Sequence, residues 1–329
     1  MKIIQSWSGV AVAAAFAAAW GGAVTDAAAQ GVYPSKNVQL ILPYSAGGST
    51  DVIARAVAKR LGDMWGKNVI VDNRPGASGM IGAETASKAE PDGYTLLSTT
   101  SSYPATAAVR AKLSFDPAKA IIPVATFARA PMLLAVHPSV PAKSVKELIA
   151  LAKKNPGTLN YSSSGTGGNN HFSGALFAAA AGIKLVHVPY KGIAPAVTAV
   201  GSGEVEMVIS SSSALLPMIN AHRVRILGVS SLEPSPLFPG VPTIAQSGAP
   251  GYSYQLWWGL FAPAGMTAER IGFINAAVNK MLATADMKKF LDTQGTEPWP
   301  QTPAQLADLL PTEIARYKKA MEVAGIAPQ

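Results

Sequence analysis

The stretch VQLILPYSAGGSTDVIARAVAKRLG, residues 38–62, decides the fold. Its first part, Val38 to Leu42, is a short apolar run that predicts a buried strand. Apolar residues then recur at helical spacing from Ile53 to Met64, while charged residues take the other face, so a helix is predicted there. A strand that passes through a short turn into a helix is the first half of a βαβ unit.

The same alternation of apolar runs and helix-period segments continues along the chain. Further strands are expected at residues 69–71, 94–98, 132–136, 159–162, 185–188, 207–210 and 226–229. Helix starts are marked at Ser144, where Glu147 completes a capping box, and at Thr302, where Pro303 takes the first helical position. The repeated pattern predicts an α/β protein with mostly parallel sheets flanked by helices.

The turn PYSAGGSTD, residues 43–51, joins the first expected strand to the first expected helix. Gly47 and Gly48 allow close approach to the backbone, and Asp51 belongs to a Ser-Thr-Asp group of the kind that caps helix starts. Free N–H groups and the positive end of the helix dipole would face an anion above the strand. The alternative is a Gly-rich turn that binds nothing. Neither a P-loop nor a Rossmann spacing is present.

A second stretch, YSSSGTGGNNH at residues 161–171, repeats the passage from strand through a Gly-rich loop to a helix. Ser and Thr also crowd the ends of two other expected strands, at residues 98–102 and 210–213, and VPYKGIAPA at 188–196 adds a phenol and a turn. Ligands of open α/β sheets bind outside the carboxyl ends of the strands. The coincidence predicts a polar cleft in which two amide-rich loops hold one anion.

The first 29 residues are expected to be an export signal. Lys2 precedes an apolar run from Val10 to Trp20, and Ala27 to Ala29 form a small-residue cleavage site before Gln30. The run is too short to span a bilayer, although an N-terminal anchor is the alternative interpretation. Because no Cys precedes Gln30, a lipoprotein anchor is excluded. The mature protein is therefore expected to start near Gln30 and to be soluble.

Composition excludes several classes of function. The chain has no Cys, which rules out disulfides, thiol nucleophiles and Cys-based metal sites. Its net charge of +8 comes from scattered Lys and Arg with no run longer than two, a pattern that disfavours a nucleic-acid or membrane patch. No cofactor is expected. The 300 residues after the signal are enough for two lobes with well-buried cores.

Two segments are expected to cross between these lobes, Phe127–Pro131 and the Pro- and Gly-rich Leu232–Tyr254. They predict a first lobe from residues 30–128 and 253–329, and a second lobe from residues 129–252. A cleft between lobes is a common place for a ligand. The pair Trp257-Trp258 is expected to pack in the core or the hinge, with lining of the cleft as the alternative.

Enzymatic function is not expected. The four histidines show no metal-site spacing, and neither H-E-x-x-H nor G-x-S-x-G occurs. A secreted hydrolase that uses a Ser and His171 is kept as an alternative, since His171 follows the second Gly-rich loop.

Several segments taken together resemble a known family. They are YPSKNVQLILPYSAGGSTDVIAR, VIVDNRPGASGMIGAE, PDGYTLL, SSSGTGG, VPYKG, PTIAQSGAPGY and WWGLFAPAGM. In this order they resemble the periplasmic solute-binding proteins of tripartite tricarboxylate transporters, often called the Bug family. The resemblance implies a two-lobed periplasmic-binding-protein-like (Venus flytrap) fold that captures a small organic acid for membrane permease subunits. The protein is expected to be a monomer. A ligand-sensing partner of a membrane receptor or kinase is the alternative role.

The resemblance also assigns site residues. The residues it matches, together with the two strand-end serines, are Tyr44, Ala46, Gly48, Ser49, Asp51, Ser98, Ser164, Thr166, Gly167, Tyr190, Gly192 and Ser210. The sequence departs from the family pattern at Glu204-Val205-Glu206 and in the loop at 98–108, which is rich in Ser and Thr and carries Tyr103. Because these loops help to select the ligand, the identity of the acid does not transfer.

Overall fold

A computed structural model describes residues 33–324 of the chain. The export signal expected at residues 1–29 lies outside the described residues. The chain divides after Ser35, and the fold given below is that of the part from Lys36 onward. Within residues 33–324, no helix combines the length and the apolar character that a bilayer crossing requires.

The first group of elements is a set of parallel strands with their helices. In chain order it comprises β1 (Val38–Leu42), α1 (Ser49–Trp65), β2 (Val69–Asn73), the 3-10 turn η1 (Ala77–Gly79), α2 (Met80–Ser87), β3 (Thr95–Thr100) and α3 (Ser102–Val109). Strand β1 lies between β2 and β3 and runs parallel to both. The strand and the helix predicted in residues 38–62 are confirmed, and α1 ends at Gly66, whose left-handed φ of 64° suits glycine.

A single long strand, β4 (Ile121–Val136), connects this group to the next. It pairs antiparallel with β9 (Gln255–Pro263) over residues 121–131, and with β7 and β8 over residues 132–136. The crossing expected at Phe127–Pro131 is therefore the middle of a continuous strand, and the expectation of a strand confined to 132–136 was wrong. Backbone hydrogen bonds to β9 support β4 over residues 121–131, where it passes from the first group of elements to the second.

The second group again alternates strands and helices. It comprises α4 (Val145–Lys154), β5 (Asn160–Ser163), α5 (Asn169–Ala181), β6 (Val186–Pro189), α6 (Ile193–Ser202), β7 (Met207–Ser211), α7 (Ser212–Asn220) and β8 (Arg225–Val229). Strand β5 is parallel to β6 and β7. At α4, Ser144 caps Glu147 N as predicted, but the Glu147 carboxylate accepts from Lys143 N, so the box is not closed on Ser144.

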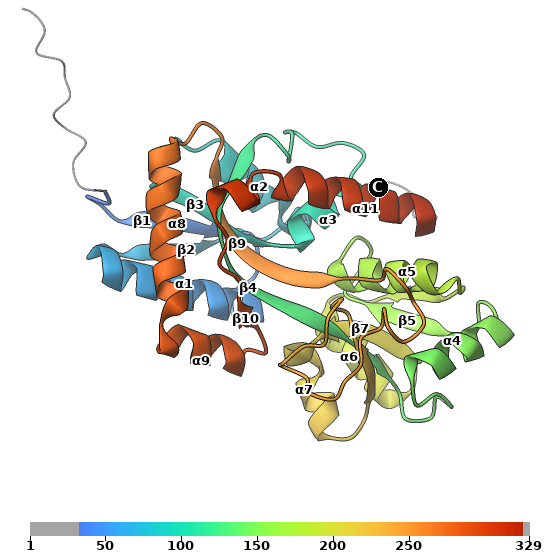
Figure 1. The fold of residues 1–329 in the computed structure, drawn as a ribbon. Helices are drawn as coiled ribbons and strands as arrows, with labels where there is room; N and C mark the ends of the chain where they lie inside the picture. Colours follow the sequence, from blue (N-terminus) through green and yellow to red (C-terminus); the bar gives the residue numbers. More distant parts are fainter. Residues whose placement is uncertain (1–32, 325–329) are drawn as a thin grey trace, which may run out of the picture. The chain divides into compact units, whose positions relative to one another are not determined.

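The C-terminal segment returns to the first group, as Figure 1 shows. After β9 come α8 (Ala268–Ala283), α9 (Ala285–Thr293), β10 (Glu297–Pro298), α10 (Pro303–Leu306) and α11 (Leu309–Ala324). Strand β9 pairs with β3, and β10 pairs with β4. The full capping box predicted at Thr302 is confirmed. Helix α11 packs against both α3 and α5, so it contacts elements of both groups.

The strands follow the order β2-β1-β3-β9-β4-β7-β5-β6, with β8 and β10 also on β4. The sheet is mixed because β4 and β9 run antiparallel to their neighbours, while the other pairings are parallel. One apolar cluster includes Ile41, Tyr103 and Trp257 on one side of β4, and another includes Val200 and Leu215 on the other. Trp257 thus packs in the core, as expected.

Candidate ligand-binding site

A cavity of about 410 Å³ lies where the loop after β1 meets the loop after β5. Its volume is within the range of small-molecule sites. Both Gly-rich loops of the sequence contribute to it, together with the starts of α3 and α5. The lining residues are Pro43, Tyr44, Ser45, Pro75, Gly76, Gly79, Ser102, Thr106, Ser164, Gly165, Thr166, Gly168, Asn169 and Asn170. None of these side chains carries a charge, so the cavity offers neutral hydrogen-bonding groups.

The start of α5 contributes backbone donors to this cavity. Gly168 is the N-cap, in an extended conformation with φ −82° and ψ 166°, and no side chain caps the helix. The first N–H groups of a helix have no partner within it. Asn170 anchors this turn, because its Nδ2 donates to Ile209 O (2.8 Å) and its Oδ1 accepts from Ser164 Oγ (3.0 Å). The amides at this helix start are therefore available to an anion.

Two stacked histidines fix the second Gly-rich loop. The rings of His171 and His187 lie 3.9 Å apart between centroids. Gly167 N–H donates to His171 Nδ1 (3.1 Å), and His187 Nε2 is 2.6 Å from Ser163 Oγ, which in turn accepts from Gly165 N–H (3.1 Å). Each ring thus holds one side of the loop.

Both histidines are neutral at ordinary pH. Burial lowers the pKa of His171 to about 4, and burial together with the neighbouring His171 lowers the pKa of His187 to about 4. Tyr161 packs against both rings, and burial keeps its hydroxyl protonated by raising the pKa well above 10. As the base of the hydrolase alternative, His171 is poorly placed, because its Nδ1 already accepts from Gly167 and its side chain is buried.

The first Gly-rich loop is fixed by a carboxylate instead. Asp51 Oδ2 accepts from Gly47 N–H (3.0 Å) and from Arg55 Nε (2.9 Å), and Oδ1 accepts from Asn73 Nδ2 (2.9 Å). The hydrogen bond from Arg55, with those from Asn73 and Gly47, lowers the pKa of Asp51 to about 2 against the opposing effect of burial. The N-cap of α1 is Gly48 and has no side-chain cap, so the interpretation of Asp51 as the capping residue was wrong. Asp51 orients the loop.

A cluster of hydroxyl groups joins this loop to the end of β3. The Tyr44 hydroxyl lies 3.0 Å from Thr99 Oγ1, 3.1 Å from Thr100 Oγ1 and 2.8 Å from Ser102 Oγ. Tyr44 and Ser102 line the cavity. A chain of hydroxyls can reorient its protons, so the cluster can donate to an acid without any charged side chain.

The comparison with known families decides what kind of protein this is. The family model described as "Tripartite tricarboxylate transporter family receptor" matches residues 53–326. The chain belongs to this receptor family.

Solved structures of other receptors agree with the assignment. An R. palustris protein with adipate is 36% identical, with a TM-score of 0.80, and the match covers 90% of this chain and 100% of that one. The periplasmic binding protein BugD is 26% identical with a TM-score of 0.76 over 90% of this chain and all of BugD. MatC from Rhodopseudomonas palustris with bound malate is 29% identical, with a TM-score of 0.74 over 88% of this chain and 99% of MatC. The predicted Bug family and two-lobed fold are confirmed.

The receptor's cavity contains some of the predicted site residues. Tyr44, Ser164 and Thr166 line it, and Gly167 lies buried directly behind Thr166. Ala46 and Gly48 are exposed but outside the lining, and the side chain of Ser49 is not described.

Other predicted residues lie elsewhere. Asp51 is only 4% exposed and fully hydrogen-bonded, while Ser98 and Ser210 are 0% exposed, so none of the three reaches the cavity. Tyr190 donates to Glu204 Oε1 (2.7 Å), and Gly192 is the N-cap of α6. For Ser98 and Ser210 the physical reason is that β3 and β7 are buried along almost their whole length, so both serines lie inside the protein.

Sequence reasoning missed part of the lining. Asn169 and Asn170 stand at the end of the quoted stretch YSSSGTGGNNH, so their position directly after the glycines could have identified them. Pro75, Gly76 and Gly79 come from the segment VIVDNRPGASGMIGAE, which was recognised only as a family landmark. The loop after β2 is rich in Pro and Gly, like the loop after β1, and this shared composition could have identified it.

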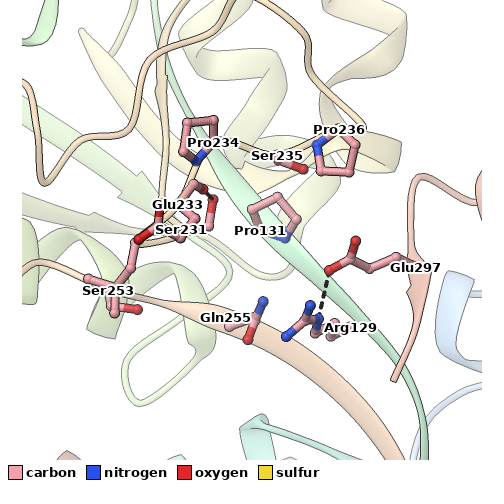
Figure 2. A pocket seen from close by; sticks show the side chains of 11 residues that line it. Arg129, Pro131, Ser231, Glu233, Pro234, Ser235, Pro236, Ser253, Gln255 and Glu297 are labelled. Carbon is pink, nitrogen blue, oxygen red and sulfur yellow. Dashed lines mark hydrogen bonds and ion pairs between the residues drawn. The ribbon is translucent and has the colours of Figure 1, made fainter. Parts of the chain in front are cut away.

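A second cavity, of about 460 Å³, lies at the crossing strands (Figure 2). Arg129 of β4 and Glu297 of β10 form an ion pair there, with Nε and Oε1 2.6 Å apart. The other lining residues are Pro131, Ser231, Leu232, Glu233, Pro234, Ser235, Pro236, Ser253 and Gln255. Neither Gly-rich loop reaches it, and Glu297 already neutralises Arg129. The cavity at the two loops is therefore the better candidate for an anion.

Proposed function

We propose that this receptor captures a small organic acid, with a preference for dicarboxylates, in the cavity between residues 43–45 and 164–170 and delivers it to the permease subunits of a tripartite tricarboxylate-type transporter. The supporting observation is that two Gly-rich loops from different parts of the sheet line one cavity with uncharged donors. Adipate and malate, named in two similar structures, are both dicarboxylates.

One carboxylate would lie at the start of α5, where uncapped N–H groups and the helix dipole favour negative charge. The other would accept from the hydroxyl cluster of Tyr44 and Ser102 across the cavity. Charge-assisted hydrogen bonds contribute about 1.5–3 kcal/mol each, so two occupied ends are needed for tight binding without a salt bridge.

Closure of the two proposed lobes, residues 30–128 with 253–329 and residues 129–252, would follow from this arrangement. A ligand that touches both loops binds the closed form more tightly and shifts the population toward it. Ala46, Gly48, Tyr190 and Gly192 remain proposed contacts of that form. The export of the protein to the periplasm and its delivery of the acid to permease subunits are proposed from its membership of the receptor family.

Thermal shift and calorimetry with a matched panel test the proposal. The panel pairs adipate with hexanoate and with adipamide, and adds malate and succinate. We expect the dicarboxylates to raise the melting temperature, and the ligands that lack one or both charges to raise it little. No response to any acid would overturn the carboxylate assignment, and an equal response to hexanoate would overturn the preference for two acidic groups.

A further inference from the structure

Asn169 is the first residue of α5, and it lines the cavity. Its Oδ1 accepts a hydrogen bond from the Tyr254 hydroxyl at 2.7 Å. The Tyr254 oxygen accepts from the Tyr317 hydroxyl at 3.1 Å, and the Tyr317 oxygen accepts from Arg316 Nη2 at 3.5 Å. Glu313 binds the same Nη2 at 3.1 Å and so anchors the far end of this chain of bonds.

Every bond in this chain runs from Arg316 toward Asn169. The guanidinium donates to the Tyr317 oxygen, the Tyr317 hydroxyl donates to Tyr254, and the Tyr254 hydroxyl donates to Asn169. Burial raises the pKa of Tyr317 to about 12 and that of Tyr254 well above 10, so both hydroxyls keep their protons at neutral pH. The acceptor end of the Asn169 amide is thereby occupied.

The donor end of the same amide is free. Asn169 Nδ2 makes no hydrogen bond to the part of the chain that the structure describes, whereas the adjacent Asn170 uses both its nitrogen and its oxygen on the protein. Because Tyr254 holds the oxygen of this amide, the two N–H groups of Nδ2 remain for a ligand in the cavity. An Asn side chain in this orientation presents donors to the cavity, which suit a carboxylate, while its oxygen is already engaged by Tyr254.

We propose that Asn169 donates its side-chain amide to the bound acid, and that Tyr254, Tyr317 and Arg316 are positioning residues that set the orientation of this amide. The inference rests on the proposed function and adds a specificity determinant to it. Asn169 stands on α5 and Tyr317 on α11, which returns from the C-terminal segment and packs against α5. The relay therefore links the start of α5 to α11 through Tyr254.

Asn169→Asp is the decisive variant, with adipate and malate as probes in calorimetry. The carboxylate of the new side chain still accepts from Tyr254 and suits a helix start, so the melting temperature should not fall. It cannot donate to an acid and repels it, so Kd should rise about 100-fold, against about 10-fold for Asn169→Ala. An unchanged Kd in Asn169→Asp would overturn the contact.

Tyr254→Phe tests the relay, and Tyr252→Phe is its matched control, because the Tyr252 hydroxyl is buried without a hydrogen-bond partner. We expect Tyr254→Phe to raise Kd about 3- to 10-fold and Tyr252→Phe to leave it unchanged. Because Tyr254 acts through Asn169, its effect should vanish in an Asn169→Ala background. Equal effects of the two Phe variants, or additive effects in the double variant, would overturn the relay.

The relay is also measurable without a ligand. Tyr254→Phe should move the side-chain amide NMR signals of Asn169, and Tyr252→Phe should not. A wild-type protein that bound none of the acids would overturn the proposed function, while these signals would still decide whether the relay orients Asn169. Unmoved Asn169 signals in Tyr254→Phe would overturn it.

Discussion

The two Gly-rich loops that line the cavity are held in place by opposite chemistry. The loop after β1 is held by an ionised carboxylate, Asp51, which bonds Gly47 N–H and Arg55. The loop after β5 is held by two uncharged rings, His171 and His187. In both cases the anchoring side chain lies outside the lining of the cavity. The comparison teaches that a Gly-rich loop can be held either by a compensated charge or by uncharged rings, and that both leave the lining of the cavity uncharged.

The largest expected difference between the loops is their response to acid. His171 and His187 have folded pKa values of about 4 against 6.5 for the ordinary side chain, so the unfolded chain binds more protons between these values. Stability is therefore full above about pH 6.5 and falls as the pH drops toward 4, by on the order of 3 kcal/mol for each histidine. Urea unfolding of the wild type across this range measures the loss.

Asp51 titrates in a different window, which makes the comparison sharp. Its folded pKa of about 2 lies below the ordinary 3.8, so its contribution is present above about pH 4 and is lost only toward pH 2. Between pH 6.5 and 4, replacement of both histidines by Gln should remove most of the slope of stability against pH. An unaltered slope in that double variant would show that other groups are responsible.

A smaller effect is expected from removing the charged anchor. Asp51→Ala removes the acceptor of Gly47 N–H, while Asn73 keeps its bond to Tyr44 O and Arg55 keeps its bond to Asn73 Oδ1. It should lower the free energy of unfolding by about 2 kcal/mol, since Arg55 is half-exposed and recovers solvation. Asp63→Ala is the matched control, because Asp63 pairs with Lys59 at the same spacing on the same helix but in full solvent. Its cost should stay below about 0.5 kcal/mol. Equal costs in chemical denaturation would contradict the role assigned to Asp51.

The smallest effect separates the two helix starts. A Cβ added at Gly168 would lie 2.9 Å from Ser164 Oγ, whereas a Cβ at Gly48 meets nothing closer than 4.0 Å. Gly168→Ala should therefore cost about 1 kcal/mol and weaken acid binding, and Gly48→Ala should cost almost nothing. Melting temperatures and Kd for adipate check both. A Gly48→Ala protein that lost binding would mean that the first loop approaches the acid more closely than the second.

Local patterns were enough to predict most of the fold and the convergence of the two loops. The strand at Val38–Leu42 is confirmed, and both quoted Gly-rich stretches line the cavity. They could be predicted because strand ends and helix starts of βαβ units meet at one edge of a sheet. Asn169 could have been predicted for the same reason, because it directly follows the second Gly-rich loop.

The remaining features depend on information that a single stretch does not contain. The segment that forms β4 contains Pro123 and Pro131, and Pro cannot donate to a sheet ladder, so its local pattern does not predict one long strand. In the structure the ladder shifts register after Pro123, and Pro131 pairs with Gln255 at the last position of the β9 pairing. A run of consecutive hydroxyl residues does not show which of them faces the cavity. Ser98 was predicted to do so, but it is buried in β3, and Ser102 at the start of α3 lines the cavity instead. The bond from Tyr254 to Asn169 spans 85 residues of sequence.

The continuity of β4 has a mechanical consequence. Because one strand of 16 residues belongs to both sets of pairings and is laced to β9 along most of its length, the two halves have no swivel at this point. Any relative rotation of the two proposed lobes would have to bend a hydrogen-bonded strand pair, which resists rotation more than an unpaired linker does. Closure around a bound acid would then bend β4 and β9 together, and release of the acid would let the strand pair relax.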